Sequence, residues 1–518
     1  MSEARLDEHA TVRERIDARA AAQGDAPFLF GPEADITLTY GDLRERSRSI
    51  ATGLAGMGLA PGDKVAFLLE NGPWTASLLL ATLYGGFVAV PLNATAGVPQ
   101  VAYVIEHCDA SVLFISAKYR EQFAAALRAC TRPLTLIETD IDRGPAAWSS
   151  AASGALGTAL AAQDDALLLY TSGTTGLPKG ARLSHRAVLA GGENTALAHQ
   201  LTAADRGLCV LPLYHINGQI VTLMGPLACG GAVVMPHRFS ATDFWSLVAR
   251  YRCTWFSVVP TIIKYLLDRA EAEGWAFGSA PELAQLRFGR CASAPLPASV
   301  QQEFEAVFKV PMIETMGLTE TCAPILSNPM PPAKRVAGSP GMAFGNEVRV
   351  ADDAGRPLAP GTVGELLVRG NNVLTGYYKN EAASAGAFHD GGWFRTGDLG
   401  YCDEAGYFFI TGRSKELIIK GGENIAPREI DDALYLHQAV LEAAAVGVAH
   451  AGYGQDVIAC VRLRDGFAAT EEELIAHCAE WLGAFKAPSR IHFMAALPKG
   501  PSGKIQRLKL PELLASPA

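Results

Sequence analysis

The sequence has no pair of cysteines at C-x-x-C spacing, although it contains ten cysteines among its 518 residues. Closely spaced cysteine pairs are typical of zinc sites and secreted disulfide frameworks, so both are disfavoured and a reducing cytosol is expected. An excess of basic residues is also absent, since the formal net charge is −9. Without a basic stripe we expect no nucleic-acid partner, and any anionic ligand must be held by local groups.

The sequence also predicts neither a secretory signal peptide nor a membrane span. Met1 to Gly24 contain many charged residues and no long apolar segment, and the last four residues are not a peroxisomal address. Two charge-free runs, Trp74 to Leu92 and Gly218 to Pro236, have the length of a membrane span. Each run contains a glycine pair followed by a short apolar stretch, which predicts helix, turn and strand. We therefore expect a cytoplasmic protein without a membrane span.

The length of the chain predicts two or more domains. Short apolar strands alternate with helical segments between Leu38 and Ser116, which is typical of a sheet covered by helices. The shared pattern of the two charge-free runs predicts two similar α/β subdomains. Beyond Gly345, short strands separated by turn residues predict a small β-barrel or antiparallel region.

A change of pattern near residue 412 predicts a domain boundary, with an N-terminal domain at 1–412 and a C-terminal domain at 413–518. Pro427 suits the first turn of one helix, and Thr470 begins a capping box for another. The predicted fold therefore combines α/β and α+β parts. A large domain of two α/β subdomains and a small β-barrel is joined near Lys415 to a small, mobile α+β domain.

The most informative segment reads Tyr-Thr-Ser-Gly-Thr-Thr-Gly-Leu-Pro-Lys-Gly from Tyr170 to Gly180, directly after a predicted strand. Glycines let backbone N–H groups approach an anion, hydroxyls add donors, and Lys179 supplies positive charge, which together suit a polyphosphate. The residues on either side of Lys179 exclude a Walker A loop. A flexible surface linker is the alternative, but it has no reason to carry Pro-Lys-Gly at this spacing.

This loop resembles the signature of the acyl-adenylate-forming superfamily, which includes acyl-CoA synthetases, peptide-synthetase adenylation domains and beetle luciferases. The resemblance covers nearly the whole chain. It continues, in the family's order, at residues 211–217, 292–296, 315–320, 393–398, 412–415 and 501–504. It implies ATP, Mg²⁺ and coenzyme A as ligands. It also implies a two-step reaction, in which a carboxylate and MgATP form acyl-AMP and the CoA thiol then displaces AMP.

The resemblance also implies which residues form the site. Those expected to contact the nucleotide are Thr171, Ser172, Gly173, Thr174, Thr175, Gly176, Lys179, Ala292, Ser293, Ala294, Thr315, Met316, Gly317, Thr319, Asp398 and Arg413. Those expected to act in catalysis are Thr175, Lys179, His215 and Lys504, with Glu320 as the Mg²⁺ ligand. Lys415 is the implied hinge, and Gly421, Gly422 and Glu423 are expected to line the pantetheine channel after the small domain rotates.

Each implied role has a plainer alternative. By resemblance Thr319 meets the α-phosphate, Asp398 accepts hydrogen bonds from the ribose, and Lys504 bridges the carboxylate and the α-phosphate. Alone, a Thr-Glu pair would be a helix cap, Asp398 would belong to a turn, and Lys504 would be a solvated lysine. Met316 stands where family members often carry an aromatic ring, so weaker stacking on adenine is expected.

The acyl substrate is expected to meet His215, Asn217 and Arg290. A core histidine and a structural ion pair are the ordinary interpretations of His215 and Arg290. The resemblance is to the oxalyl-CoA synthetase branch at residues 215–218, 238–241, 254–261 and 326–329. We therefore favour a short acid with a second anionic group, such as oxalate or sulfoacetate.

Three other functions stay open at this stage: loading of a carrier protein, activation of medium- or long-chain fatty acids, and nucleotide sensing without catalysis. No carrier-protein attachment sequence follows Lys504, which disfavours the first. A sensor would need neither Glu320 nor Lys504. The oligomeric state is left open, with a homodimer as one option.

Overall fold

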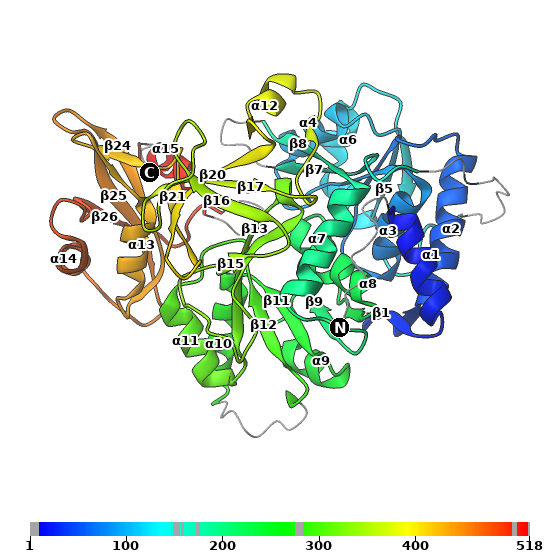
Figure 1. Cartoon of the computed structure of the whole chain (residues 1–518), viewed down its shortest axis with the longest axis horizontal. Coiled ribbons are helices and arrows are strands. Elements are labelled where there is room, and N and C mark those ends of the chain that lie inside the picture. Colours follow the sequence, from blue (N-terminus) through cyan, green and yellow to red (C-terminus); the bar gives the residue numbers. More distant parts are fainter. Residues whose placement is uncertain are drawn as a thin grey trace.

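Figure 1 shows the computed structural model of the chain, which describes residues 10–146, 148, 156, 160–171, 177–274, 283–499 and 505–515. Within these residues the strands form four sheets, named A to D below, of nine, seven, five and five strands. Sheet D, drawn in orange, lies at the opposite end of the molecule from helices α1 (Val12–Gln23) and α2 (Tyr40–Gly56).

Sheet A has a parallel centre and antiparallel edges. Its strands follow the order β15-β14-β13-β12-β11-β9-β10-β1-β2. Their bounds are β1 (Pro27–Gly31), β2 (Ile36–Thr39), β9 (Arg206–Cys209), β10 (Ala232–Val234), β11 (Trp255–Val258), β12 (Phe288–Cys291), β13 (Met312–Leu318), β14 (Ala323–Ser327) and β15 (Met342–Ala343). Trp255 and Phe256 face opposite sides of the sheet and both are fully buried, as expected where helices cover both faces.

Sheet B repeats this arrangement, with a parallel centre and two antiparallel strands at one edge. Its order is β18-β8-β7-β4-β3-β5-β6. The bounds are β3 (Lys64–Leu68), β4 (Val88–Pro91), β5 (Val112–Ile115), β6 (Thr135–Glu138), β7 (Asp165–Thr171), β8 (Lys179–Ser184) and β18 (Gly376–Tyr377). One continuous core joins both sheets through the helices between them, so the two predicted α/β subdomains form a single packed unit.

The helices of these two sheets contribute to that core, to a second one on the far face of sheet A and to a third one on the far face of sheet B. They are α3 (Pro73–Gly85), α4 (Val98–His107), α5 (Ala117–Gln122), α6 (Ala124–Ala129), α7 (His185–Ala198), α8 (Gly225–Cys229), α9 (Phe244–Arg250), α10 (Pro260–Ala272) and α11 (Ala298–Phe308). Helices α9, α10 and α11 pack on the far face of sheet A, and α4, α5 and α6 pack on the far face of sheet B. Helices α3 and α7 belong to the shared core.

Sheets C and D follow in the chain. Sheet C is antiparallel and occupies the region predicted as a small barrel, with β16 (Glu347–Ala351), β17 (Gly364–Arg369), β19 (Phe388–His389), β20 (Trp393–Cys402) and β21 (Phe408–Arg413). Sheet D contains β22 (Ile418–Lys420), β23 (Glu423–Ile425), β24 (Val440–His450), β25 (Gly454–Leu463) and β26 (Arg490–Phe493). The helices here are α12 (Glu381–Ala385), α13 (Pro427–Tyr435), α14 (Glu471–Leu482) and α15 (Leu510–Ala515).

The predicted combination of α/β and α+β parts is confirmed. Pro427 opens α13, and Thr470 caps α14 with the predicted capping box. The second charge-free run differs in one respect, because its helix begins as a π-helix, η1 (Asn217–Met224), before α8. Hydrophobic periodicity does not distinguish the wider π turn from an α turn.

The two charge-free runs also contribute helices that are too short to cross a membrane. Among the described residues, no helix has the length and hydrophobicity of a membrane span. The ten cysteines are free thiols, and seven of them are buried, which agrees with their interpretation as small hydrophobic residues.

Candidate active site

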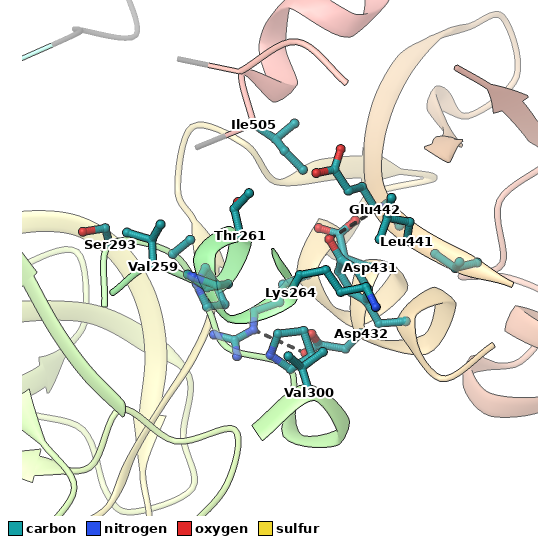
Figure 2. A pocket seen from close by; sticks show the side chains of 18 of the residues that line it. Val259, Thr261, Lys264, Ser293, Val300, Asp431, Asp432, Leu441, Glu442 and Ile505 are labelled. Carbon is teal, nitrogen blue, oxygen red and sulfur yellow. Dashed lines mark hydrogen bonds and ion pairs between the residues drawn. The ribbon is translucent and has the colours of Figure 1, made fainter. Parts of the chain in front are cut away.

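A cavity of about 1190 Å³ lies between the ends of sheet A and helix α13 of the C-terminal region. Figure 2 shows Thr261 and Ser293 on one side and Asp431 and Glu442 on the other. Ile505, which directly follows Lys504 in sequence, lies at the same opening. Elements that are far apart in the sequence therefore line the same cavity.

Most of the described residues predicted to bind adenosine line this cavity. They are Ser293, Ala294, Thr315, Met316, Gly317, Asp398 and Arg413. The carboxyl ends of neighbouring parallel strands meet at one edge of a sheet, which places the segments that follow β12 and end β13 side by side. Ala292 is buried beside them, but it is not part of the cavity lining in the described chain.

Asp398 and Arg413 are paired across β20 and β21 at the cavity. Nε of Arg413 donates a hydrogen bond to Oδ1 of Asp398 over 2.8 Å, and this carboxylate raises the pKa of Arg413. Oδ2 of Asp398 is buried and has no hydrogen-bond partner in the described part of the chain. A buried acceptor without a donor is costly, so this oxygen suits a ligand hydroxyl group.

Beside the same cavity, the backbone at the end of β13 lies very close to the backbone of Ala323. A Cβ atom on Gly317 would lie 2.3 Å from the carbonyl oxygen of Ala323, so only glycine fits here. The hydroxyl of Thr315 is buried and has no partner among the described residues. Ser293 adopts a positive φ of 74°, which turns the chain sharply after β12.

Lys179 and Glu320 come together through Tyr377, a residue that the sequence did not predict. The ammonium group of Lys179 lies 5.3 Å from the centroid of the Tyr377 ring, and the Tyr377 hydroxyl donates to Oε1 of Glu320 over 3.2 Å. Strand β18 brings Tyr377 beside β8, although the two strands are nearly 200 residues apart in sequence. Thr319 precedes Glu320 in a short 3₁₀ turn after β13.

Five residues of the predicted phosphate loop, 172–176, and the predicted catalytic Lys504 lie outside the described residues. Their roles, including that of Thr175, stay predictions. The ends of the loop are described, because Thr171 and Lys179 pair across the β7–β8 hairpin. The predicted strand before the loop is confirmed as β7.

The three residues predicted to meet the acyl substrate do not line the cavity in the described chain. His215 is half-buried against the ring of Tyr214, with ring centroids 4.7 Å apart. Arg290 is 1% exposed and donates to Oδ1 of Asn217 over 3.2 Å. No carboxylate of the described chain forms a salt bridge with Arg290. Burial lowers the pKa of Arg290 to about 9.

The residues predicted to act after rotation of the small domain lie away from the cavity lining. Gly421 and Gly422 form the exposed turn between β22 and β23, followed by exposed Glu423. Lys415 lies in the exposed turn that connects β21 of sheet C to β22 of sheet D. The hinge role and the domain boundary stay predictions.

Glu314 is a cavity residue that sequence reasoning missed. Its carboxyl group is buried, and Oε1 accepts a hydrogen bond from the Leu296 backbone N–H over 3.2 Å. Burial raises the pKa of Glu314 from 4.5 to about 7. A carboxylate at an apolar strand position was the available signal, since charged side chains rarely occur in the centre of a sheet without a role.

Comparison with known proteins identifies the family. Residues 16–378 match the AMP-binding enzyme family, and residues 429–504 match the AMP-binding enzyme C-terminal domain. The chain belongs to the AMP-binding enzyme family. The predictions of an enzyme and of the acyl-adenylate-forming superfamily are confirmed.

Family members with related sequences have known activities. The chain is 46% identical to sulfoacetate–CoA ligase from Cupriavidus necator, over 96% of this chain and 97% of that protein. It is 35% identical to oxalate–CoA ligase from Arabidopsis thaliana, over 90% of this chain and 91% of that protein.

Solved structures of the family share the fold. ATP-bound MatB from Rhodopseudomonas palustris has a TM-score of 0.87 and 30% identity, covering 97% of this chain and 99% of that one. o-Succinylbenzoate coenzyme A synthetase from Bacillus subtilis, in complex with ATP and magnesium ion, has a TM-score of 0.82 and 28% identity. That match covers 96% of this chain and 99% of the other.

Proposed function

We propose that this protein is an ATP-dependent acid–CoA ligase that forms acyl-CoA through acyl-AMP, and that its acid is short and carries a second anionic group. The chain is an acid–thiol ligase of the AMP-forming class, with ATP, Mg²⁺ and coenzyme A as its ligands. The observation that supports the mechanism best is the cavity that collects the Asp398–Arg413 pair, the end of β13 and Ile505.

The chain's own groups suit each part of the nucleotide. The unpartnered Oδ2 of Asp398 would accept a ribose hydroxyl while Arg413 holds the carboxylate in place. The backbone at Ser293 and the thioether of Met316 would border the flat adenine. Lys179 would contribute positive charge beside the phosphates. Lys504, which precedes Ile505 in the sequence, would neutralise charge on the reacting carboxylate and α-phosphate.

Glu320 fits a Mg²⁺ ion that is shared with the nucleotide. Among the described residues, no group of three or more His, Cys, Asp and Glu residues could hold a metal ion alone. Mg²⁺ is usually held by one or two carboxylates together with phosphate oxygens, so a single half-buried glutamate agrees with this mode. When bound, the ion would neutralise phosphate charge. Tyr377 would orient the Glu320 carboxylate through its hydroxyl group.

The substrate class rests on Arg290 and on the relatives. A buried guanidinium without a carboxylate partner in the described chain is suited to an anionic ligand. The two relatives above are a sulfoacetate–CoA ligase and an oxalate–CoA ligase, and both acids carry a second anionic group. The predicted cytoplasmic location and the homodimer stay predictions.

An AMP-release screen with ATP, Mg²⁺ and CoA tests the proposal. We expect sulfoacetate or oxalate to exceed propanoate and octanoate by roughly 100-fold or more in kcat/KM, because a neutral chain leaves buried donors unpaired. Release of AMP should require CoA, and acyl-CoA should appear by mass spectrometry.

A preference for octanoate, or AMP release that is indifferent to CoA, would contradict the proposal. The second result would favour a carrier protein as acceptor. Lys504→Ala provides the background rate, since it lacks the ammonium group expected to act in acyl-AMP formation.

A further inference from the structure

Three buried polar side chains contact one another on the face of sheet A that packs against the core shared with sheet B. Arg290 lies on β12, Ser257 lies on β11, and Asn217 begins the π-helix η1. Ser257 and Arg290 are register partners on adjacent strands, so their side chains point to the same side. Their exposed fractions are 1%, 0% and 5% for Arg290, Ser257 and Asn217. The cluster is therefore part of the shared core of sheets A and B.

The hydrogen bonds of this cluster determine how each group is oriented. Nη1 of Arg290 donates to Oδ1 of Asn217 over 3.2 Å and to Oγ of Ser257 over 3.0 Å. The Ser257 hydroxyl donates in turn to the same Asn217 oxygen over 3.0 Å. A guanidinium can only donate, so the amide oxygen of Asn217 must face it and the amide nitrogen must point elsewhere.

Two of the donors that remain after these bonds are made are fully buried. Nε of Arg290 and Nδ2 of Asn217 are buried and have no acceptor among the described residues. Glu314, on the neighbouring strand, pairs with Cys291 and so faces the opposite side of the sheet from Arg290. Buried donors without acceptors are rare, and a ligand that supplies acceptor oxygens would satisfy both.

Two buried side chains nearby, Gln219 and His199, also have unpartnered polar atoms, and neither is hydrogen-bonded to Arg290 or Asn217 in the described chain. Oε1 of Gln219 also lacks a partner in the described chain. Gln219 lies two residues after Asn217 on η1, and side chains two apart on a helix do not face each other. The amide nitrogen of Gln219 donates to the carbonyl oxygen of Leu213.

We propose that Arg290 Nε and Asn217 Nδ2 form a donor pair that recognises the second anionic group of the acyl substrate, and that Ser257 is the residue that positions them. This inference rests on the proposed function. The occupant is an anionic group with several acceptor oxygens, either sulfonate or carboxylate. Ser257 accepts from the guanidinium of Arg290 and donates to the amide oxygen of Asn217, so it fixes the orientation of the two donor groups relative to each other.

The test uses three single variants of the full chain. In Ser257→Ala, KM for sulfoacetate or oxalate should rise about tenfold, while KM for ATP stays within about twofold, because one bridging hydroxyl is lost. Ser257→Thr keeps the hydroxyl and should restore most of the affinity. Ser47→Ala makes the same change at another fully buried serine, in α2, and should leave both KM values unaltered.

Arg290→Leu provides a second, independent measurement. Removing a buried charge that lacks a counter-ion should preserve or raise Tm, while the preference for the anionic acid over propanoate falls by roughly 100-fold. Comparing sulfoacetate with oxalate shows which anionic group the pair prefers.

The results separate the two proposals. If the wild type releases AMP with an anionic acid but Ser257→Ala and Arg290→Leu raise KM equally for anionic and neutral acids, the donor pair is refuted and the ligase activity stands. If no anionic acid supports CoA-dependent AMP release by the wild type, the proposed substrate class itself is wrong.

Discussion

At the residue scale, Glu314 shows how burial changes a common side chain. The carboxyl group is 3% exposed, and only one of its oxygens has a hydrogen-bond partner among the described residues. Desolvation is the main cause of its raised pKa, opposed by the charge of Arg428 and reinforced by Asp432, both from α13. The group is therefore sensitive to pH in a range where an exposed glutamate is always ionised.

The raised pKa of Glu314 predicts that the folded protein loses stability as the pH rises. Its pKa rises on folding from 4.5 to about 7, so the favourable contribution of the neutral form is complete below pH 4.5 and is lost as the pH rises through about 7. The full effect is about 3 kcal/mol. Glu314→Gln keeps the acceptor for Leu296 and cannot ionise, so its Tm relative to wild type should increase between pH 5 and pH 8.

Differential scanning fluorimetry at both pH values measures this difference. Glu303→Gln, the same change at an exposed position on α11, should show no such trend. A Tm difference for the Glu314 variant that is equal at pH 5 and pH 8 would show that the buried carboxyl group does not titrate in this range.

At the element scale, α7 and the π-helix η1, which begins at Asn217, approach unusually closely. A Cβ atom on Gly191 of α7 would lie 2.2 Å from the carbonyl oxygen of Cys322 and 2.8 Å from Cγ2 of Ile220 on η1. Neither distance is compatible with a normal contact. The glycine is therefore required by packing, although its position in a helix interior disfavours it intrinsically.

Gly191→Ala tests this packing. Helix propensity alone would predict a gain of about 1 kcal/mol, but we expect a loss of about 1–3 kcal/mol because η1 or the Cys322 backbone must move. Urea denaturation measures the change. At Gly386, the C-cap of α12, an added Cβ makes an ordinary 3.4 Å contact, so Gly386→Ala should be nearly neutral. A stabilised Gly191 variant would disprove the tight contact.

At the scale of the whole molecule, the cavity lies between sheet A and the C-terminal region, and the turn at Lys415 connects the two parts. The Gly421–Gly422 turn is exposed and is not part of the lining in the described chain. In the described chain the cavity is therefore lined by residues expected to bind adenosine, whereas the residues expected to line the pantetheine channel lie outside it. The rotation about Lys415 stays a prediction.

Lys415→Pro should separate the two half-reactions. Proline restricts φ, so the variant should form acyl-AMP at a near-normal rate while CoA-dependent release of AMP falls by roughly 100-fold or more. Pyrophosphate release in a single turnover measures the first step, and acyl-CoA formation from isolated acyl-AMP measures the second. Lys415→Ala removes the same side chain without restricting φ, so this variant should carry out both half-reactions at near-normal rates. Equal loss of both steps would exclude the hinge role.

Much of the fold and part of the site followed from the sequence because they depend on local signals. Alternating helix and strand patterns indicated the two sheets, and the capping box at Thr470 marked α14. The ordered motifs indicated several residues that line the cavity. The π-helix at Asn217 did not follow, because the wider turn has no periodic signature in the sequence.

The order of its motifs by itself determined that this protein is an adenylate-forming enzyme, because each motif carries its chemistry within a few consecutive residues. Only the tertiary structure decided which distant side chains meet: Tyr377 with Glu320, and Ser257 with Asn217 and Arg290. It also decided that Arg290 has no carboxylate partner among the described residues. Such facts depend on strand order and register across long loops, which no local pattern of residues encodes.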